Sequence, residues 1–178
     1  MGQDSTPDYF KQTILAHLDA AYNLARWLTG DAAAAEDLVQ EASLRAFRSF
    51  HTLSGPNPKA WFMAIVRNLC VDWLRGHRQR DREQEYDDSL HGVIAADTDR
   101  TPEALAIRAA EARHLHAAIA ALPLEFREAI VLREMEEMSY KEISAIIHVP
   151  IGTVMSRLSR GRDLLALSLR GVARQAAQ

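Results

Sequence analysis

The stretch "SYKEISAIIHVPIGTVMSRLSRGRDLL", residues 139–165, carries hydroxyl and guanidinium side chains at spacings that suit DNA contacts. On a helix beginning after Pro150, the polar side chains that lie away from the apolar positions are Thr153, Ser156, Arg157 and Arg160. Arginine can bond guanine O6 and N7 in the major groove or contact phosphate, and serine and threonine can contact either. An amphipathic helical hairpin with a solvated arginine face is the alternative, so spacing alone favours DNA binding without settling it.

Two short helices must position these side chains. Ser139 and Glu142 form the pattern of a capping box, in which each residue satisfies a backbone N–H of the first turn. Pro150 lacks an N–H, so it ends the first helix and can open the second. The residues predicted to face inward are Ile143, Ile146, Ile147, Val154, Leu158 and Leu165. The pattern predicts a helix-turn-helix folded around His148-Val149-Pro150.

A second group of side chains, in "NPKAWFMAIVRNLCVDWLRGHRQR" and just beyond it, combines cations with aromatic rings. The basic residues are Lys59, Arg67, Arg75, Arg78, Arg80 and Arg82, and the aromatic residues are Trp61, Phe62 and Trp73. Cations that follow a backbone, with rings or pockets that receive bases, suit single-stranded nucleic acid. The rings also keep helical spacing with Ile65, Val66 and Leu69, which favours the core for most of them. Base capture is therefore expected from the preceding Gly/Pro loop and from polar positions such as Asn68.

The formal net charge of -3 conceals an uneven distribution of charge along the 178 residues. Residues 57–82 carry six basic and two acidic side chains, whereas residues 83–103 carry one and seven. Residues 104–178 carry ten basic and eight acidic side chains. Because salt screens charges beyond about 8 Å, a phosphate responds to the local patch and not to the mean. An acidic chain can therefore still bind DNA through its basic blocks.

Several classes of protein are disfavoured by what the sequence lacks. It has no apolar run of the length that a membrane span needs and no signal-peptide pattern at its start, so we expect no membrane insertion. The single cysteine, Cys70, cannot form an internal disulfide, which fits a cytoplasmic location. No Cys/His cluster, phosphate-binding glycine loop or nucleophile–base pair is present. We therefore expect no metal, no cofactor, no small-molecule substrate and no enzymatic activity.

The fold class predicted is all-α, because no window alternates with period two. Helices are expected over residues 8–29, from the Asp31 cap to about Phe50, and over 57–80, 101–122 and 124–136, before the helix-turn-helix. The second of these is given an apolar face that includes Phe47 and Phe50. The acidic composition and weak periodicity of the intervening segment predict a flexible linker. The predicted organisation is one helical domain over 8–82, a linker over 83–101 and a second helical domain over 102–172.

Three blocks occur in an order that resembles a known family. "AEDLVQEASLRAF", "AWFMAIVRNLCVDWLR" and, after the acidic segment, "ALPLEFREAIVLREMEEMSYKEISAIIHVPIGTVMSRLSRGR" closely resemble alternative bacterial sigma factors of the extracytoplasmic-function (ECF) group. The resemblance covers roughly residues 10–170. It implies a chain made of sigma region 2, a linker and sigma region 4. It also implies that the chain acts as a subunit of RNA polymerase in promoter recognition and transcription initiation.

The resemblance also implies roles for individual residues of the first domain. Docking on the clamp helices of the polymerase β′ subunit is expected at Glu36, Asp37, Gln40 and Glu41. The loop from Thr52 to Lys59 and the helix after it match the part that melts and reads the −10 element. The −10 contacts are expected at Lys59, Trp61, Arg67, Asn68, Arg75 and Arg78. The loop residues "SGPNP" are peculiar to this chain, so the captured base cannot be carried over.

Region 4 of the family reads the −35 element in duplex DNA, which the resemblance places on residues 139–162. Combining the spacing with the resemblance, we expect the −35 contacts at Thr153, Met155, Ser156, Arg157, Ser159 and Arg160. Met155 stands where family members often have Lys or Arg, which puts one phosphate or base contact in doubt. The −35 preference of a relative therefore does not transfer to this chain.

The partners implied are core RNA polymerase, through its β′ and β subunits, and promoter DNA, duplex at −35 and melted at −10. A partner anti-sigma factor is expected from the family alone. Two competing hypotheses remain from the residues. One is a stand-alone transcriptional regulator with a C-terminal helix-turn-helix, and the other is an adaptor or anti-sigma decoy without DNA activity.

Overall fold

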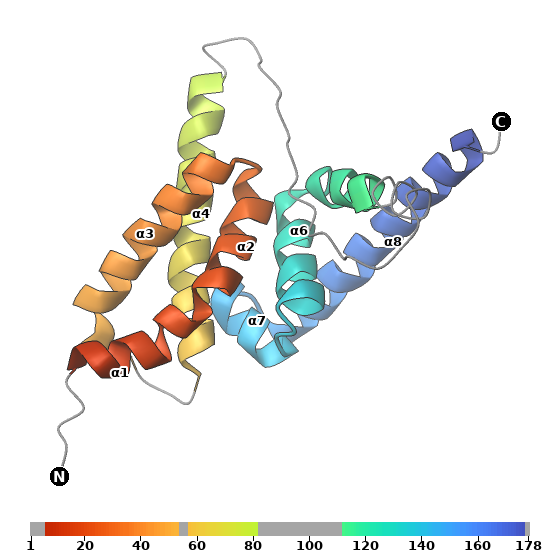
Figure 1. The fold of residues 1–178 in the computed structure, drawn as a ribbon. Helices are drawn as coiled ribbons and strands as arrows, with labels where there is room; N and C mark the ends of the chain where they lie inside the picture. The colour runs from red at the N-terminus through yellow and green to blue at the C-terminus, as the bar shows by residue number, and fades with distance from the viewer. Residues whose placement is uncertain (1–5, 54–56, 82–111, 177–178) are drawn as a thin grey trace, which may run out of the picture.

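The computed structural model describes residues 6–53, 57–81 and 112–176, and within these ranges the chain is helical and has no strand. The all-α prediction is confirmed. The predicted linker and the first turns of the helix expected from residue 101 lie outside the described residues. We call the described residues between 6 and 81 the N-terminal unit and residues 112–176 the C-terminal unit. The two units occupy opposite sides of the molecule in Figure 1.

The N-terminal unit consists of helices α1 (Thr6–Thr13), α2 (Leu18–Thr29), α3 (Ala32–Arg48) and α4 (Pro58–Asp81), with 3-10 turns η1 (Leu15–His17) and η2 (Phe50–Thr52). Helix α2 packs against both α3 and α4, and α3 packs against α4, so the three form a bundle. Helix α1 crosses the end of this bundle (Figure 1). Gly30, with φ 76°, ends α2 in the left-handed conformation, and the Asp31 carboxylate accepts from Ala34 N at 3.0 Å to cap α3. Both predicted boundaries are confirmed.

The single helix predicted over residues 8–29 is wrong, because it breaks into α1, η1 and α2. Ile14 and His17 have φ values of -110° and -108°, outside the helical range, on either side of the 3-10 turn. The break redirects α1 so that the ring of Phe10 lies 5.2 Å from that of Phe50. Phe10 and Ile14 are buried as a result. Packing has overridden a continuous helical pattern here.

The expected burial of Phe47 is also wrong, since 51% of this residue is exposed. The buried residues of α3 are Ala35, Val39, Ala42 and Ala46. Small alanines let α3 approach α2 and α4 closely, whereas the larger Phe47 ring points toward Phe10, with 5.2 Å between their centroids. The edge of the bundle near α1 therefore keeps an apolar surface in contact with solvent.

The C-terminal unit begins with a helix over residues 112–120 and continues with α6 (Leu124–Ile130), the π-helical turn η3 (Val131–Met135), α7 (Tyr140–Ile147) and α8 (Ile151–Ala176). Helix α8 packs against α6 and α7, and it is the long helix that runs to the C-terminus in Figure 1. At Gly161, a Cβ atom would lie 3.0 Å from Ile130 Cγ1, so glycine permits the close approach of α8 to α6.

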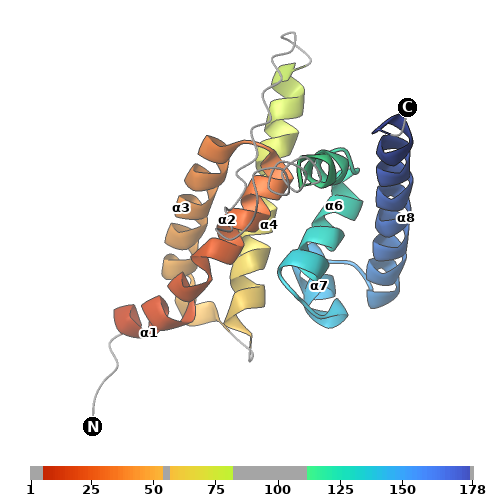
Figure 2. The same ribbon diagram turned by 45° about the vertical axis from the view of Figure 1, so that its right-hand side comes forward.

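The two units touch along one face. Helix α7 packs against α4, and α6 packs against α2, so the C-terminal unit sits on the side of the bundle formed by those two helices. Figure 2 shows the same side-by-side arrangement from a second angle. The indole of Trp27 stacks on the imidazole of His116, with 4.1 Å between ring centroids. Helix α3 lies away from this contact and keeps one face open.

Candidate nucleic-acid interface

Helices α7 and α8 form the helix-turn-helix that the sequence predicts. Ser139 Oγ accepts from Glu142 N at 3.3 Å, and the Glu142 carboxylate accepts from Ser139 N at 2.6 Å, which completes the capping box. These bonds lower the pKa of Glu142, the hydrogen bonds with Ser139 being the largest cause. His148 ends α7 in the left-handed region, with φ 56°, and the chain turns there into α8. Val154 and Leu158 are buried, which fixes the rotation of α8 about its axis.

That rotation leaves most of the predicted −35 residues exposed at the start of α8. Met155, Ser156, Ser159 and Arg160 are exposed, and Thr153 is half-buried. Ser156 Oγ donates to Thr153 O at 3.0 Å, which holds its hydroxyl oxygen at the helix surface. Arg160 has no hydrogen bond or ion pair among the residues that the structure describes, so its guanidinium can reach a groove or a phosphate without first breaking a contact.

Arg157 is placed differently from the rest of this set. Its Nη1 donates to Glu128 Oε1 at 3.0 Å, and its side chain is only 24% exposed. The contact ties α8 to α6 inside the C-terminal unit. In this arrangement Arg157 holds the helix that presents the other side chains.

The predicted −10 residues follow α4 but divide into two groups. Asn68 and Arg75 are exposed, and Trp61 is partly buried against the core. Arg78 lies in α4, and the structure describes its backbone only. Lys59 and Arg67 instead contact the C-terminal unit. Arg67 donates to Glu128 from Nε at 2.8 Å and from Nη2 at 3.2 Å, and Lys59 Nζ donates to Glu136 O at 3.0 Å.

Glu128 and Glu136 are the residues that sequence reasoning missed. They are 1% and 8% exposed, and they are the buried charged residues within the described ranges. Glu128 follows Leu124 by four residues and precedes Leu132 by four, so it occupies the apolar stripe of its helix. A carboxylate at a core position signals a buried ion pair, because an unpaired charge there is costly. The position of Glu128 on the apolar stripe could therefore have indicated a buried ion pair, although it does not identify the cation that pairs with Glu128.

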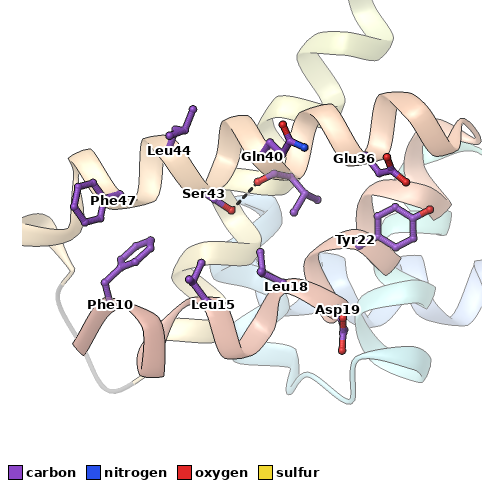
Figure 3. A pocket seen from close by; sticks show the side chains of 11 residues that line it. Phe10, Leu15, Leu18, Asp19, Tyr22, Glu36, Gln40, Ser43, Leu44 and Phe47 are labelled. Carbon is purple, nitrogen blue, oxygen red and sulfur yellow. Dashed lines mark hydrogen bonds between the residues drawn. The ribbon is translucent and has the colours of Figure 1, made fainter. Parts of the chain in front are cut away.

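The four predicted polymerase-docking residues lie together on the open face of α3. Glu36, Asp37 and Gln40 are exposed, and the half-exposed Glu41 pairs with Arg45 at 2.7 Å. Beside them a groove of about 700 Å³ runs between α3 and the α1–η1–α2 segment (Figure 3). Its lining residues are Phe10, Leu15, Leu18, Asp19, Tyr22, Glu36, Val39, Gln40, Ser43, Leu44 and Phe47. Apolar side chains form its floor and acidic or amide groups its rim, an arrangement that suits an amphipathic helix.

Burial shifts the pKa of three further groups near these faces. Burial and the nearby Lys59 lower the pKa of His17, and burial and Arg26 lower that of His116. Cys70 is buried, and burial raises the pKa of its thiol to about 12, so this thiol is unreactive near neutral pH. Among the described residues no group of His, Cys, Asp and Glu could hold a metal ion. Within the same ranges, no helix has the length and apolar character needed to cross a lipid bilayer.

Two family models match the chain, Sigma-70 region 2 over residues 13–80 and Sigma-70, region 4 over residues 112–165. The chain is 36% identical over 164 residues to the ECF RNA polymerase sigma factor SigE of Mycolicibacterium smegmatis, covering 92% of this chain and 63% of that protein. This chain thus spans less than two thirds of that relative's length. It is 30% identical over 169 residues to the ECF RNA polymerase sigma factor SigW of Bacillus subtilis, covering 92% of this chain and 90% of that protein.

Solved structures are also similar over nearly the whole chain, and one of them is 28% identical in sequence. It is the co-crystal structure of the sigma factor RpoE in complex with the anti-sigma factor NepR from Bartonella quintana. The match has a TM-score of 0.74 and 28% sequence identity, and it covers 90% of this chain and 96% of that one.

Proposed function

The chain belongs to the sigma-70 family, within its extracytoplasmic-function group, and on that premise we propose that it directs RNA polymerase to promoters. The proposal is a transcription initiation factor that binds core polymerase and reads −10 and −35 elements. Its main support is that both family matches fall on helical units whose exposed faces carry the side chains such a role needs. We propose residues 8–82 and 102–172 as the two working domains, joined by residues 83–101.

The docking face for the β′ clamp helices is Glu36, Asp37, Gln40 and Glu41 on α3, extended by the apolar groove beside them. The acidic rim attracts a basic or amide-rich helix, and the exposed Leu44 and Phe47 offer it apolar area. Burying this surface would supply most of the affinity for polymerase. Neither proposed DNA-reading face takes part in the contact, so docking on α3 does not cover either of them.

Promoter reading is divided between the two units. The half-buried Thr153 and the exposed Met155, Ser156, Ser159 and Arg160 of α8 read the −35 duplex from the major groove. On α4 we propose Lys59, Trp61, Arg67, Asn68, Arg75 and Arg78 for the −10 strand. Each face alone holds few cations and binds weakly at physiological salt. Docking both on one polymerase makes the second contact intramolecular, which raises the effective affinity and helps offset the cost of unstacking bases.

Catalysis belongs to core polymerase in this proposal, and the chain itself performs no chemistry and uses no cofactor or small-molecule substrate. Its partners are the β′ and β subunits and promoter DNA. An anti-sigma factor is the expected regulator, by analogy with the RpoE–NepR complex. All of these partners meet the chain in the cytoplasm.

Run-off transcription tests the function directly. Core polymerase is assayed on a promoter library with and without the chain, and initiation at defined start sites should depend on its addition. Tight binding of the chain alone to duplex DNA, with no initiation from any promoter, would favour a stand-alone regulator. Binding to polymerase without initiation would favour an adaptor or decoy.

Charge reversal tests the docking face separately from DNA reading. The double variant Asp37→Lys/Glu41→Lys should bind core polymerase at least about tenfold more weakly, because like charges would then meet at the interface. Asp163→Lys is the matched control, since Asp163 is an exposed acidic residue on α8, away from α3. Unchanged helical content by circular dichroism shows that the bundle is intact. Equal affinities for the docking variant and the control would remove α3 from the interface.

A further inference from the structure

A second cleft, with a volume of about 350 Å³, lies where α4 of the N-terminal unit meets α6 and α8 of the C-terminal unit. It is separate from the groove beside α3, because the described residues that line the two do not overlap. Pockets that hold small molecules have volumes of about 300–1,000 Å³. The cleft is at the lower end of that range, which favours a compact organic molecule over a protein helix.

The charged side chains that line this cleft are Arg67, Arg75, Arg157, Glu125 and Glu128. Three guanidinium groups therefore face two carboxylates, which leaves an excess of one positive charge. Glu128 is already neutralised, because its oxygens accept two hydrogen bonds from Arg67 and one from Arg157. The remaining positive charge favours an anionic ligand in this cleft.

Arg157 has unused hydrogen-bond donors on the wall of the cleft. A guanidinium carries several N–H groups, and among the described residues that of Arg157 donates only one hydrogen bond, from Nη1 to Glu128 Oε1. Within the same ranges, none of its nitrogen atoms is both buried and without a partner, so the unused N–H groups reach solvent. The side chain is only 24% exposed, so an anion bonded to it would be partly sheltered from water and salt.

Arg75 is the second cation that a ligand could bind. Its Nη1 lies 3.8 Å from Asp72 Oδ1, and the two side chains are 78% and 70% exposed, so water and salt weaken this pair. The guanidinium of Arg75 can therefore turn toward an anion without breaking a strong contact. Together, Arg75 on α4 and Arg157 on α8 offer one anionic head group a cationic partner from each unit.

The rest of the lining is apolar and comes from both units. The apolar lining residues are Val71 and Leu74 on α4, Pro123 before α6 and Leu124 at its first position. An apolar ligand body would pack between these side chains and leave water. Glu125 lines the same cleft, is exposed, and has no hydrogen bond or ion pair among the described residues. Because its carboxylate repels further negative charge, the lining suits a ligand with a single anionic group.

We propose that this cleft binds a small organic carboxylate, with its apolar body packed between α4 and the start of α6 and its carboxylate held by Arg157 and Arg75. The occupant is a ligand that the chain does not convert. The site itself is independent of the proposed function. Its consequence rests on that function, because Arg75 is also a residue that we assign to the −10 strand, and a bound carboxylate would compete with the strand for it.

Binding is tested on the full chain with the fluorescent aromatic anion anilinonaphthalene sulfonate. Naphthoate, a carboxylate with a similar apolar body, should displace this probe, and naphthamide, the neutral analogue of naphthoate, should not. Arg75→Gln should weaken the affinity for the probe about threefold, because the ion pair that it removes is largely exposed. Glu125→Gln should strengthen the affinity about twofold, because it removes a like charge from the exposed lining.

Arg48→Gln is the matched control, since Arg48 is an exposed arginine of α3 that lines neither the groove nor the cleft. It should leave the affinity for the probe unchanged. All three substituted residues are exposed, so each variant should melt at the temperature of the wild type. Equal affinities of Arg75→Gln, Glu125→Gln and the control would overturn the site, as would equal displacement by naphthoate and naphthamide. Run-off transcription reports the proposed function separately, so the two proposals can fail independently.

Discussion

Replacing Arg157 and Arg160 one at a time by alanine separates two roles that could not be distinguished from residue type and spacing. Both lie in the first turns of α8, three residues apart, and both were predicted to contact −35 DNA. In the structure Arg160 is exposed, whereas Arg157 donates to the buried carboxylate of Glu128. We expect Arg157→Ala to lower the free energy of unfolding and Arg160→Ala to impair promoter reading.

The loss of unfolding free energy in Arg157→Ala depends on the hydrogen bonds that Glu128 retains. Removing the sole partner of a buried charge costs about 3–5 kcal/mol. Glu128 retains both hydrogen bonds from Arg67, so the loss approaches that of one charged hydrogen bond, about 2 kcal/mol. For a chain of this size, that loss corresponds to a fall in melting temperature of about 4–8 °C. Arg160→Ala should change stability by less than about 0.5 kcal/mol, because exposed substitutions away from special contacts have small effects.

Urea and thermal unfolding followed by circular dichroism measure the stability of each variant, and run-off transcription from a −35-dependent promoter measures reading. Arg160→Ala should weaken initiation by about 1–3 kcal/mol while its unfolding curve matches the wild type. If the two variants unfold alike, Glu128 does not hold Arg157 in solution. If Arg160→Ala initiates normally from every promoter, Arg160 does not read DNA.

Two further predictions concern the helix-turn-helix. Bonds to Ser139 lower the folded-state pKa of Glu142, so its contribution to stability is present above the ordinary value of 4.5 and is lost as pH falls through the lowered pKa. In urea unfolding at neutral pH, Glu142→Gln should therefore be less stable than the wild type. At strongly acidic pH the two proteins should be nearly equal in stability, and a difference that persists in acid would contradict this account. His148 is exposed and holds φ 56° at the end of α7, a conformation that glycine adopts freely, so His148→Gly should raise stability by about 0.5–1 kcal/mol. A lower melting temperature for His148→Gly would show that the imidazole makes a stabilising contact.

The local elements could be predicted from the sequence because their causes lie within a few residues. The Asp31 cap, the Gly30 stop, the capping box of Ser139 and Glu142 and the inward face of Val154 and Leu158 are all found where helical periodicity and side-chain chemistry placed them. Where tertiary packing competed, the prediction failed. The break at Ile14 and the exposure of Phe47 depend on how α1 meets the end of the bundle.

Apart from the break at Ile14, the sequence by itself determined the helices of the described ranges, their caps and the pool of polar residues that could meet DNA or polymerase. The tertiary structure alone decided which of those residues are available. Arg67 and Glu128 are separated by 61 positions along the chain, and neither periodicity nor capping acts over that distance. Only the packing of α6 and α7 on the α2–α4 bundle brings their charges together, and burial makes their pairing matter energetically. The same packing leaves Arg160 exposed while it pairs Lys59 and Arg67 with glutamates, so basic residues that are equal candidates in the sequence differ in the structure in whether they are free.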